Sequence, residues 1–580
     1  MAWSQTNVAL TGKDYVSRFN TFRSWYQTLP SSSLPEFIEF IKQGTPLSQK
    51  LRGKWLYELA KNKDWTSFLT YYQTTSDLNL VCYKQIALFQ TGLVEQALKD
   101  SYPLWLTGDS LPPSCTHLFD LLLKTGKFDQ NLITERLILA LAQRNISLAY
   151  YLLKQYTHSH AQDLQKLASI YTNPANITPI STSDLTDDFY LYGLKRLVAL
   201  NMEKAIHFWK QAKSLLSESQ QQAFLAHITL YKAMRNHEDT LLWLNKVKPQ
   251  YYNEILIDWS IRFALKHEDW SHVRQLINAS KNKDMPCWQY WLARSLQAQG
   301  KKEEAQVIYE SLAKNRHYYG FLASLRLNKA PSFEDEKPSA DLVIIRPYQT
   351  IMDEIESLYK SKKILEASRL LNDFISELPK DEASALVYWV DSKLKWYGKS
   401  VYLSNETLNN QLYLRFPLAY NDAIGYFSKQ YGLPPEFVYA IIRQESGFRD
   451  DVVSTVGARG LMQVMPRTAA VVSKTSKIPY TNPNQLFLPQ KNINIGTAYL
   501  QQLAKQFKNH PVLMAAAYNA GPRQVVYWLK NHPPKEIDIW IETLPWQETR
   551  NYLKNVLAFY VVYQFRLHQK PDIKNFMQIL

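Results

Sequence analysis

Apolar residues recur with a helical period along residues 14–330, in segments that are separated by short polar joints. In several segments a first amphipathic helix ends at a Gly or Asn, and a second helix carries an Ala about five residues later. Gly92 and Ala97 show this spacing, and so do Gly300 and Ala305. Units of this kind bury their apolar faces only by stacking on their neighbours, so the pattern predicts an α-solenoid of irregular repeats.

Two later changes in the pattern predict further domains. The stretch NKAPSFEDEKPSADLVIIRP at 328–347 is rich in proline and charge, which is typical of a domain boundary. Helical patterns continue beyond it, and from about Gln411 they are joined by glycine-containing loops. We therefore expect a solenoid domain at 1–338, a helical linker domain at 339–410 and a last domain at 411–580. No long strand pattern is present, although ARGLMQVMP could hold a short hairpin, so the predicted fold class is mainly all-α.

The composition agrees with a well-packed helical protein. Of 580 residues, 46% are apolar and 21% are charged, and only 17 are Gly. No apolar run of about 18 residues predicts a membrane span. The start, MAWSQTNVAL, lacks the charged region and apolar core of a secretion signal, so we expect either a cytoplasmic protein or a mature form with a replacement Met1.

The three cysteines form no CxxC pair and no metal-ligand pattern. Cys82 and Cys115 lie 33 residues apart in adjacent predicted helical hairpins. A disulfide between them can form if the compartment is oxidising. The alternative is that these two residues and Cys287 are three separate buried thiols.

Positive charge is concentrated in the last domain. The chain has a formal net charge of +15, and residues 452–535 contain ten Lys or Arg but no Asp or Glu. A fold does not require this bias, which favours an acidic polymer as partner, either nucleic acid or a glycan that bears carboxylated peptides. Because no recognised nucleic-acid-binding motif accompanies the charge, we do not expect nucleic acid to be the partner.

The segment YGLPPEFVYAIIRQESGF predicts a helix that begins at Pro434 and Pro435. Val438, Ile441 and Glu445 lie on one face of this helix, so Glu445 points the same way as the apolar stripe. Desolvation and the negative end of the helix dipole should both raise its pKa, as a general acid requires. The alternative is a core glutamate that pairs with a nearby arginine, Arg443 or Arg449.

Three further segments carry candidate binding residues. GARGLMQVMP places Gln463 between glycines, which let backbone approach a ligand closely. AAAYNAGPRQV ends a small-residue helix at Tyr518 and Asn519, and ETLPWQETRNYLKNVL adds Glu542 and Glu548. Taken singly, each segment has a structural alternative: an ordinary turn, a helix stop with a structural tyrosine, or an ion pair.

In this order and spacing the segments resemble the catalytic domain of the soluble lytic murein transglycosylases, which are goose-lysozyme-like enzymes. The matching elements are ESGF, GLMQVMP, NINIGTAYL, AYNAGP and ETRNYLKNV, at 445–448, 460–466, 492–500, 517–522 and 548–556. The resemblance is dense over roughly 415–565. It extends more loosely to the N-terminal part, where LWLTGDSLPPSCTHLF is similar to a segment of the superhelical ring that precedes a linker domain in the large members of this family.

The resemblance implies a role for each matched residue. Glu445 would be the sole catalytic acid and base, Tyr518 would orient or tune it, and Glu548 would contact the muramyl side of the cleft. Arg459 and Arg523 depart from the family pattern and add charge beside the groove. Ser454, Gln463 and Met465 would line the sugar sites, and Tyr518 and Asn519 would face Glu445 and the glycosidic linkage.

The implied reaction explains how one carboxyl could suffice. Glycoside hydrolysis usually employs two carboxyl groups. In the family's reaction, Glu445 protonates the oxygen between N-acetylmuramic acid and N-acetylglucosamine and then takes the proton of the same sugar's C6 hydroxyl. A 1,6-anhydro ring closes without water. Asp450 and Asp451 follow the helix in a polar stretch, where a solvated surface role is expected.

The remaining expectations concern partners and compartment. Peptidoglycan strands are the expected substrate, in the periplasm, and the solenoid is a candidate docking surface for proteins of cell-wall synthesis or of a secretion machinery. We expect a monomer that needs no cofactor and no metal. Two rivals stay open: a muramidase of the same fold that releases a reducing end, and a helical-repeat scaffold with an inactive lysozyme-like tail.

Overall fold

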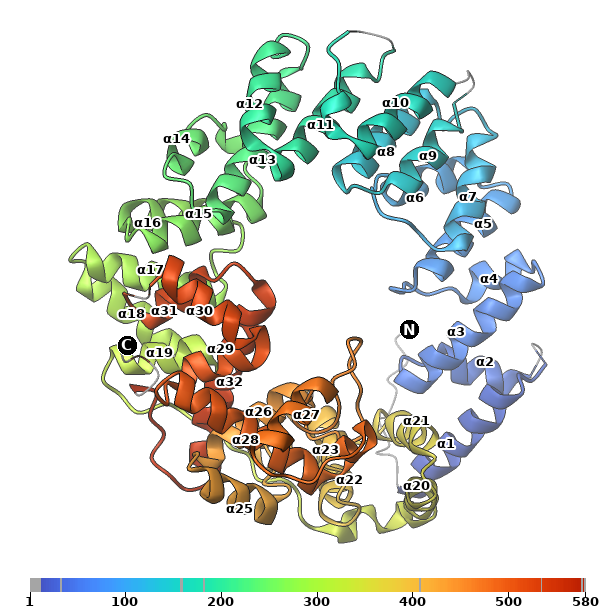
Figure 1. Ribbon diagram of the computed structural model, residues 1–580. Helices are drawn as coiled ribbons and strands as arrows, with labels where there is room; N and C mark the ends of the chain where they lie inside the picture. Colours follow the sequence, from blue (N-terminus) through green and yellow to red (C-terminus); the bar gives the residue numbers. More distant parts are fainter. Residues whose placement is uncertain are drawn as a thin grey trace. The chain divides into compact units, whose positions relative to one another are not determined.

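The computed structural model describes residues 12–31, 34–156, 160–180, 183–405, 408–533, 535–574 and 577. In these ranges the chain forms 32 α-helices and four short 3-10 helices (Figure 1). Two isolated bridges, Val453–Arg459 and Arg459–Val464, lie where the sequence suggested a short hairpin. The mainly all-α fold class is therefore confirmed. No helix within the described ranges is long and apolar enough to cross a membrane.

The chain divides into two compact units. Unit 1 comprises Met1–Lys232 and Glu238–Tyr252, and unit 2 comprises Ala233–His237 and Asn253–Leu580. This division falls at Tyr252, well before the proline-rich segment at 328–347 in which the sequence suggests a boundary. The three-domain division at 338 and 410 stays a prediction.

Unit 1 is a succession of helical hairpins. Its helices are α1 (Gly12–Gln27), α2 (Pro35–Lys42), α3 (Pro46–Lys61), α4 (Trp65–Tyr71), α5 (Leu78–Gln90), α6 (Val94–Trp105), α7 (Pro113–Leu123), α8 (Gln130–Ala142), α9 (Ile146–Leu153), α10 (Ala161–Thr172), η1 (Pro174–Asn176), α11 (Thr186–Leu200), α12 (Met202–Gln211), most of α13 (Glu218–Met234), α14 (Thr240–Leu244) and η2 (Pro249–Tyr251).

Unit 2 begins with further hairpins and ends with the segment that carries the candidate motifs. Its helices are α15 (Glu254–Lys266), α16 (Trp270–Ala279), α17 (Pro286–Ala298), α18 (Lys302–Leu312), α19 (Tyr318–Arg326), η3 (Leu342–Tyr348), α20 (Gln349–Lys360), α21 (Ile364–Ile375), α22 (Lys380–Ser392), α23 (Tyr397–Leu403), α24 (Leu412–Arg415), α25 (Asn421–Tyr431), α26 (Pro435–Glu445), α27 (Pro466–Thr475), η4 (Pro483–Phe487), α28 (Pro489–Gln506), α29 (Pro511–Ala520), α30 (Pro522–Asn531), α31 (Ile537–Thr543) and α32 (Gln547–Arg566).

The Gly-to-Ala spacing read from the sequence marks the joints of two hairpins. In α5–α6 the joint contains Gly92, with φ 89°, and Ala97 is fully buried. In α17–α18 the corresponding residues are Gly300, with φ 81°, and Ala305, which is also buried. The left-handed conformation suits glycine, and the buried alanine lets the second helix pack closely on the first.

A disulfide joins two helices of unit 1. Cys82 of α5 and Cys115 of α7 are bonded, and their Cα atoms are 5.0 Å apart. Both residues are fully buried. Cys287, in α17, is a free and partly buried thiol.

In unit 2, α26 and α32 pack antiparallel along their lengths (Figure 1). Near the start of α26, the Tyr560 hydroxyl donates to Glu436 Oε1 at 3.2 Å. In the middle, the rings of Tyr439 and Tyr563 stack with centroids 4.9 Å apart. The far end of this helix pair carries the candidate active site.

Candidate active site

Glu445 is the last residue of α26, and the sequence explains how it comes to lie there. Pro435 occupies the first turn of the helix, where proline is well tolerated. Val438, Ile441 and Ile442 are fully buried, so the apolar stripe faces the core as the spacing predicted. Gly447, with φ 56°, then allows the chain to turn away directly after the helix.

The carboxyl group of Glu445 lies in a largely desolvated position. Burial raises its pKa from 4.5 to about 7, and the nearby charge of Glu548 adds to the rise. A hydrogen bond from the Tyr552 hydroxyl to Glu445 Oε1, at 2.7 Å, acts in the opposite direction and lowers the pKa. The residue keeps some exposed surface. A carboxyl with a pKa near 7 can both give and accept a proton at neutral pH.

Neither candidate arginine pairs with Glu445. Arg443 donates through Nε to the Arg415 carbonyl at 3.0 Å, and its guanidinium lies 5.2 Å from the centre of the Phe416 ring. Arg449 lies 3.7 Å from Asp451. The geometry therefore differs from that of a core glutamate held by an arginine.

The hydroxyl that donates a hydrogen bond to Glu445 is that of Tyr552, whereas the resemblance implied that Tyr518 would orient or tune the acid. The Tyr518 hydroxyl donates instead to the carbonyl of Met462 at 2.8 Å. Tyr518 still lies close enough for the charge of Glu445 to help raise the tyrosine pKa, after the larger effect of burial. Tyr518 thus ties α29 to the loop before α27, beside the acid rather than bonded to it.

Asn519 and Glu548 lie at the junction of α29 and α32. Asn519 Oδ1 accepts a hydrogen bond from the Thr549 hydroxyl at 2.8 Å, which joins the end of α29 to the first turn of α32. Glu548, the residue before Thr549, is exposed to solvent. These contacts bring Asn519, Glu548 and Glu445 into one neighbourhood.

Asn492 fixes the loop that carries Met462. Its Oδ1 accepts from the Met462 backbone amide at 2.8 Å, and its Nδ2 donates to the carbonyls of Arg459 and Leu486, each at 2.8 Å. Asn492 is fully buried in α28. A Cβ at Gly460 would lie 2.1 Å from the Leu486 carbonyl oxygen, so only glycine permits this close approach.

The other predicted sugar contacts lie in or next to the same loop. Ser454 Oγ accepts from the amide of Ala458 at 3.0 Å. Gln463 uses its amide nitrogen within the loop, donating to the Gly460 carbonyl at 2.8 Å, so its side-chain oxygen is the group left for a ligand. Met465 is 36% exposed. No hydrogen bond within the described ranges joins Ser454 or Gln463 to Glu445.

The remaining carboxyl groups named in the sequence analysis are engaged elsewhere. Burial raises the pKa of Asp450, which interacts with Tyr420 and Lys362. Asp451 is exposed. Glu542 is fully buried and ion-paired with Lys554 at 2.9 Å, and these contacts lower its pKa to about 2. Glu548 is therefore the one candidate among these residues for a second carboxyl beside Glu445.

The two arginines that depart from the family pattern have different surroundings. Arg459 donates through Nη1 to Asn484 at 2.9 Å, and its guanidinium lies 5.5 Å from the centre of the Phe487 ring. It is thus held against η4. Arg523 is exposed on α30.

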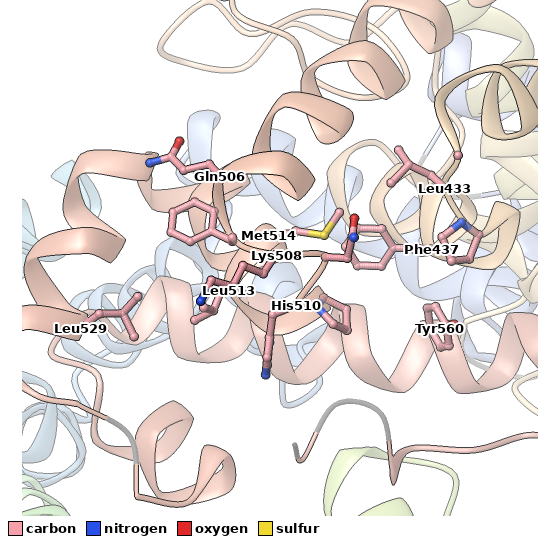
Figure 2. A pocket seen from close by; sticks show the side chains of 14 residues that line it. Leu433, Phe437, Gln506, Lys508, His510, Leu513, Met514, Leu529 and Tyr560 are labelled. Carbon is pink, nitrogen blue, oxygen red and sulfur yellow. The ribbon is translucent and has the colours of Figure 1, made fainter. Parts of the chain in front are cut away.

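A large cavity lies at the opposite end of α26 from Glu445. Its volume is about 800 Å³, and Phe437, Met514 and Tyr560 are among its lining residues (Figure 2). Phe437 precedes Glu445 by eight residues, which corresponds to about 12 Å along a helix. The cavity is therefore separate from the acid, and its walls are mainly apolar.

Sequence reasoning missed two residues of this site. Tyr552 was part of a quoted motif, and it lies one helical turn after Glu548 on the same face of α32, which is a usable signal. Asn492 belongs to the matched segment NINIGTAYL and is fully buried, and a buried asparagine implies hydrogen bonds to backbone. The sequence did not indicate which backbone groups those would be.

Comparisons with known proteins match most of this chain to one family. Residues 422–541 match the family described as "Transglycosylase SLT domain", and residues 543–571 match the "Soluble lytic transglycosylase helical domain". The soluble lytic murein transglycosylase of Escherichia coli (strain K12) is 30% identical over 555 residues, which cover 91% of this chain and 84% of that protein.

Two solved structures are similar over nearly the whole chain. An inactive glutamate-to-glutamine mutant of the lytic transglycosylase Slt from Pseudomonas aeruginosa has a TM-score of 0.79 at 29% identity, with 97% of this chain and 95% of that chain covered. The 70 kDa soluble lytic transglycosylase of Escherichia coli has a TM-score of 0.72 at 28% identity, with 97% and 93% covered. The chain therefore belongs to the family of soluble lytic murein transglycosylases.

Proposed function

We propose that this protein cleaves the β-1,4 bond between N-acetylmuramic acid and N-acetylglucosamine in peptidoglycan and leaves a 1,6-anhydro-N-acetylmuramic acid end. Glu445 acts first as acid and then as base. The observation that carries this proposal is a largely buried carboxyl group that accepts a hydrogen bond from Tyr552 and pairs with neither Arg443 nor Arg449, and burial raises its pKa to about 7. Such a group is protonated in a large fraction of molecules at neutral pH.

The reaction needs two proton transfers at one carboxyl group. Glu445 gives its proton to the bridging oxygen as the bond from that oxygen to C1 of the muramic acid breaks. The 2-acetamido group stabilises the cation that develops at C1. The C6 hydroxyl oxygen then bonds to C1 while its proton passes to Glu445, which restores the acid. Because the attack is intramolecular, effective molarities of order 10⁵ M or more replace a positioned water.

Tyr552 serves both halves of this cycle. Its hydroxyl favours the ionised carboxylate that exists between the two proton transfers, whereas burial favours the protonated acid that begins the cycle. The balance leaves the pKa of Glu445 at about 7, below the value that burial alone would give. A single carboxyl can then work in both directions at one pH.

The sugar contacts complete the proposal. We assign Glu548 to the muramyl side of the site, because it is exposed and its charge acts on Glu445. Asn519 is assigned to the glycosidic linkage beside Glu445, and its side-chain nitrogen is the group not bonded to Thr549. Ser454, Gln463 and Met465 are assigned to sugars further along the strand. The absence of acidic residues from 452–535 favours a substrate with lactyl-peptide carboxylates.

The substrate places the enzyme in the periplasm, and the disulfide between Cys82 and Cys115 supports an oxidising compartment. The helices of the predicted solenoid, 1–338, are the surface that we assign to protein partners, either of cell-wall synthesis or of a secretion machinery.

The test is digestion of purified peptidoglycan in water labelled with the heavy oxygen isotope. Mass spectrometry should find muropeptides lighter than the hydrolysis product by one water molecule and free of label at C1. Glu445→Gln, as the matched control, should give no products. Label at C1 would show a muramidase instead, and a wild-type protein without any product would favour the scaffold.

A further inference from the structure

Helix α31 carries two buried carboxylates that the proposed chemistry does not use. Asp538 is 2% exposed and Glu542 is 1% exposed. Asp538 is bonded to residues of α17 and α19, and Glu542 to residues of α15, α17 and α19; these three helices precede the proline-rich segment in the sequence. Burying a carboxylate costs free energy unless the group is paired and fully hydrogen-bonded. Each of these two carboxylates therefore needs specific partners in the surrounding helices.

Glu542 is held from several sides. Its Oε2 accepts from the Tyr319 hydroxyl at 2.6 Å and from Trp291 Nε1 at 3.2 Å. Its Oε1 accepts from Arg262 Nη2 at 3.2 Å. Lys554 of α32 lies 2.9 Å from Oε2. Glu542 therefore connects α15, α17 and α19 to α32 through one carboxylate.

The attachment point on α32 lies directly behind the residue that contacts the acid. Lys554 and Arg550 are each two residues from Tyr552, and two helical residues are about 200° apart around the axis. Arg550 lies 5.1 Å from the centre of the Trp259 ring of α15. Helix α32 thus presents Tyr552 to Glu445 on one side and two cations to α15–α19 on the opposite side.

Asp538 provides an internal comparison. Its side chain accepts from the Tyr290 hydroxyl at 2.7 Å and from Arg326 at 3.2 Å, and it also pairs with Arg294. Within the described ranges, all its hydrogen bonds and ion pairs go to α17, to α19 or to its own helix. Asp538 therefore fixes α31 without a hydrogen bond or ion pair to α32 in the described ranges.

We propose that Glu542 and Lys554 are positioning residues, through which α15, α17 and α19 set the place of Tyr552 on Glu445. The helices at the end of the solenoid are then part of the catalytic apparatus. This inference rests on the proposed function of Glu445 as acid and base. In this inference the Tyr552 hydroxyl acts on Glu445. Residues more than two hundred positions earlier in the chain hold Tyr552 in place through Glu542 and Lys554.

The test compares the pH dependence of kcat/KM in the full-length protein and its variants. Tyr319→Phe removes one hydroxyl from Glu542 and keeps the ring, and Lys554→Met breaks the link to α32. Because the Tyr552 hydrogen bond lowers the pKa of Glu445, a displaced Tyr552 should let that pKa rise. The falling limb of the profile should move to higher pH, and kcat should fall about threefold to tenfold with little change in KM.

Tyr290→Phe is the matched control, because Tyr290 is buried like Tyr319 and donates a hydrogen bond of similar length to Asp538 instead of Glu542. It should lower the melting temperature by about as much as Tyr319→Phe and leave the falling limb in place. If both variants move the falling limb equally, or if neither variant moves it, the positioning role is overturned.

A double-mutant cycle of Lys554→Met with Tyr552→Phe distinguishes two effects: the positioning of Tyr552, and the direct effect of the Lys554 charge on the pKa of Glu445. Without the Tyr552 hydroxyl, Lys554→Met should no longer move the limb. A shift that persists would assign the effect to charge and contradict the inference. These measurements require a wild type that forms anhydro products. If the proposed function is wrong, peptidoglycan digestion by the wild type shows it before any variant is compared.

Discussion

Replacing Glu445 by glutamine should make the protein more stable above neutral pH while it abolishes turnover. The physical reason is the desolvation that raises the pKa of Glu445 from 4.5 to about 7. In the unfolded chain the carboxyl ionises near pH 4.5, but in the folded protein it resists ionisation until about pH 7. The wild type therefore loses stability as the pH rises between these two values, and the neutral glutamine does not.

The magnitude follows from the same pKa. A rise from 4.5 to about 7 corresponds to about 3 kcal/mol of unfolding free energy at pH 8, and the partial exposure of the residue reduces this to about 2 kcal/mol. At pH 4 the carboxyl is protonated in both states, so the difference should vanish. In a cooperative unit of catalytic-domain size, about 2 kcal/mol corresponds to about 4–8 °C.

The assay is thermal unfolding of the wild type and Glu445→Gln at pH 4 and at pH 8. Asp451→Asn is the control, because Asp451 is an exposed carboxylate six residues away and its substitution should change stability little at either pH. A glutamine variant that gains nothing at pH 8, or that gains equally at both pH values, would refute the view that Glu445 is held in a desolvated position.

Three further predictions follow from the same contacts. Tyr552→Phe should move the falling limb of the kcat/KM profile upward by about one pH unit, because it removes the hydrogen bond that lowers the pKa of Glu445; an unmoved limb would separate Tyr552 from the acid. Asn492→Ala should cost about 2–4 kcal/mol in unfolding free energy and lower kcat, since three buried backbone groups lose their partner; guanidinium titration measures the cost, and a cost below about 1 kcal/mol would contradict the role. Cys82→Ser with Cys115→Ser should lower stability by about 2–4 kcal/mol in the same titration and leave the product unchanged, whereas a changed product would tie the disulfide to the chemistry.

The sequence was most informative where the structure depends on local spacing. The stripe Val438, Ile441 and Ile442 predicted both the helix and the inward direction of Glu445, because the helical period alone fixes which residues share a face. The spacing of Gly92 and Ala97 predicted a hairpin joint for the same reason. Chemistry could also be predicted here, since burial at a helix C-terminus has a definite effect on a carboxyl pKa.

Contacts between distant segments could not be read in this way. Tyr518 and Tyr552 both occur in matched motifs, and only the packing of α32 on α26 decides which hydroxyl meets Glu445. Glu542 was a candidate for the chemistry by sequence, but its partner Arg262 lies 280 residues away and makes it a structural ion. Periodicity assigns a residue to a face, whereas pairing across such distances depends on the three-dimensional fold.

The central claim is that one carboxyl group serves both proton transfers, and Glu548→Gln tests it most directly in peptidoglycan digestion with heavy-oxygen water. The account predicts weaker substrate binding, continued turnover and anhydro products without label, as in the wild type. If Glu548→Gln is as inactive as Glu445→Gln, or if label enters the products, the site works with two carboxyl groups and the account is wrong.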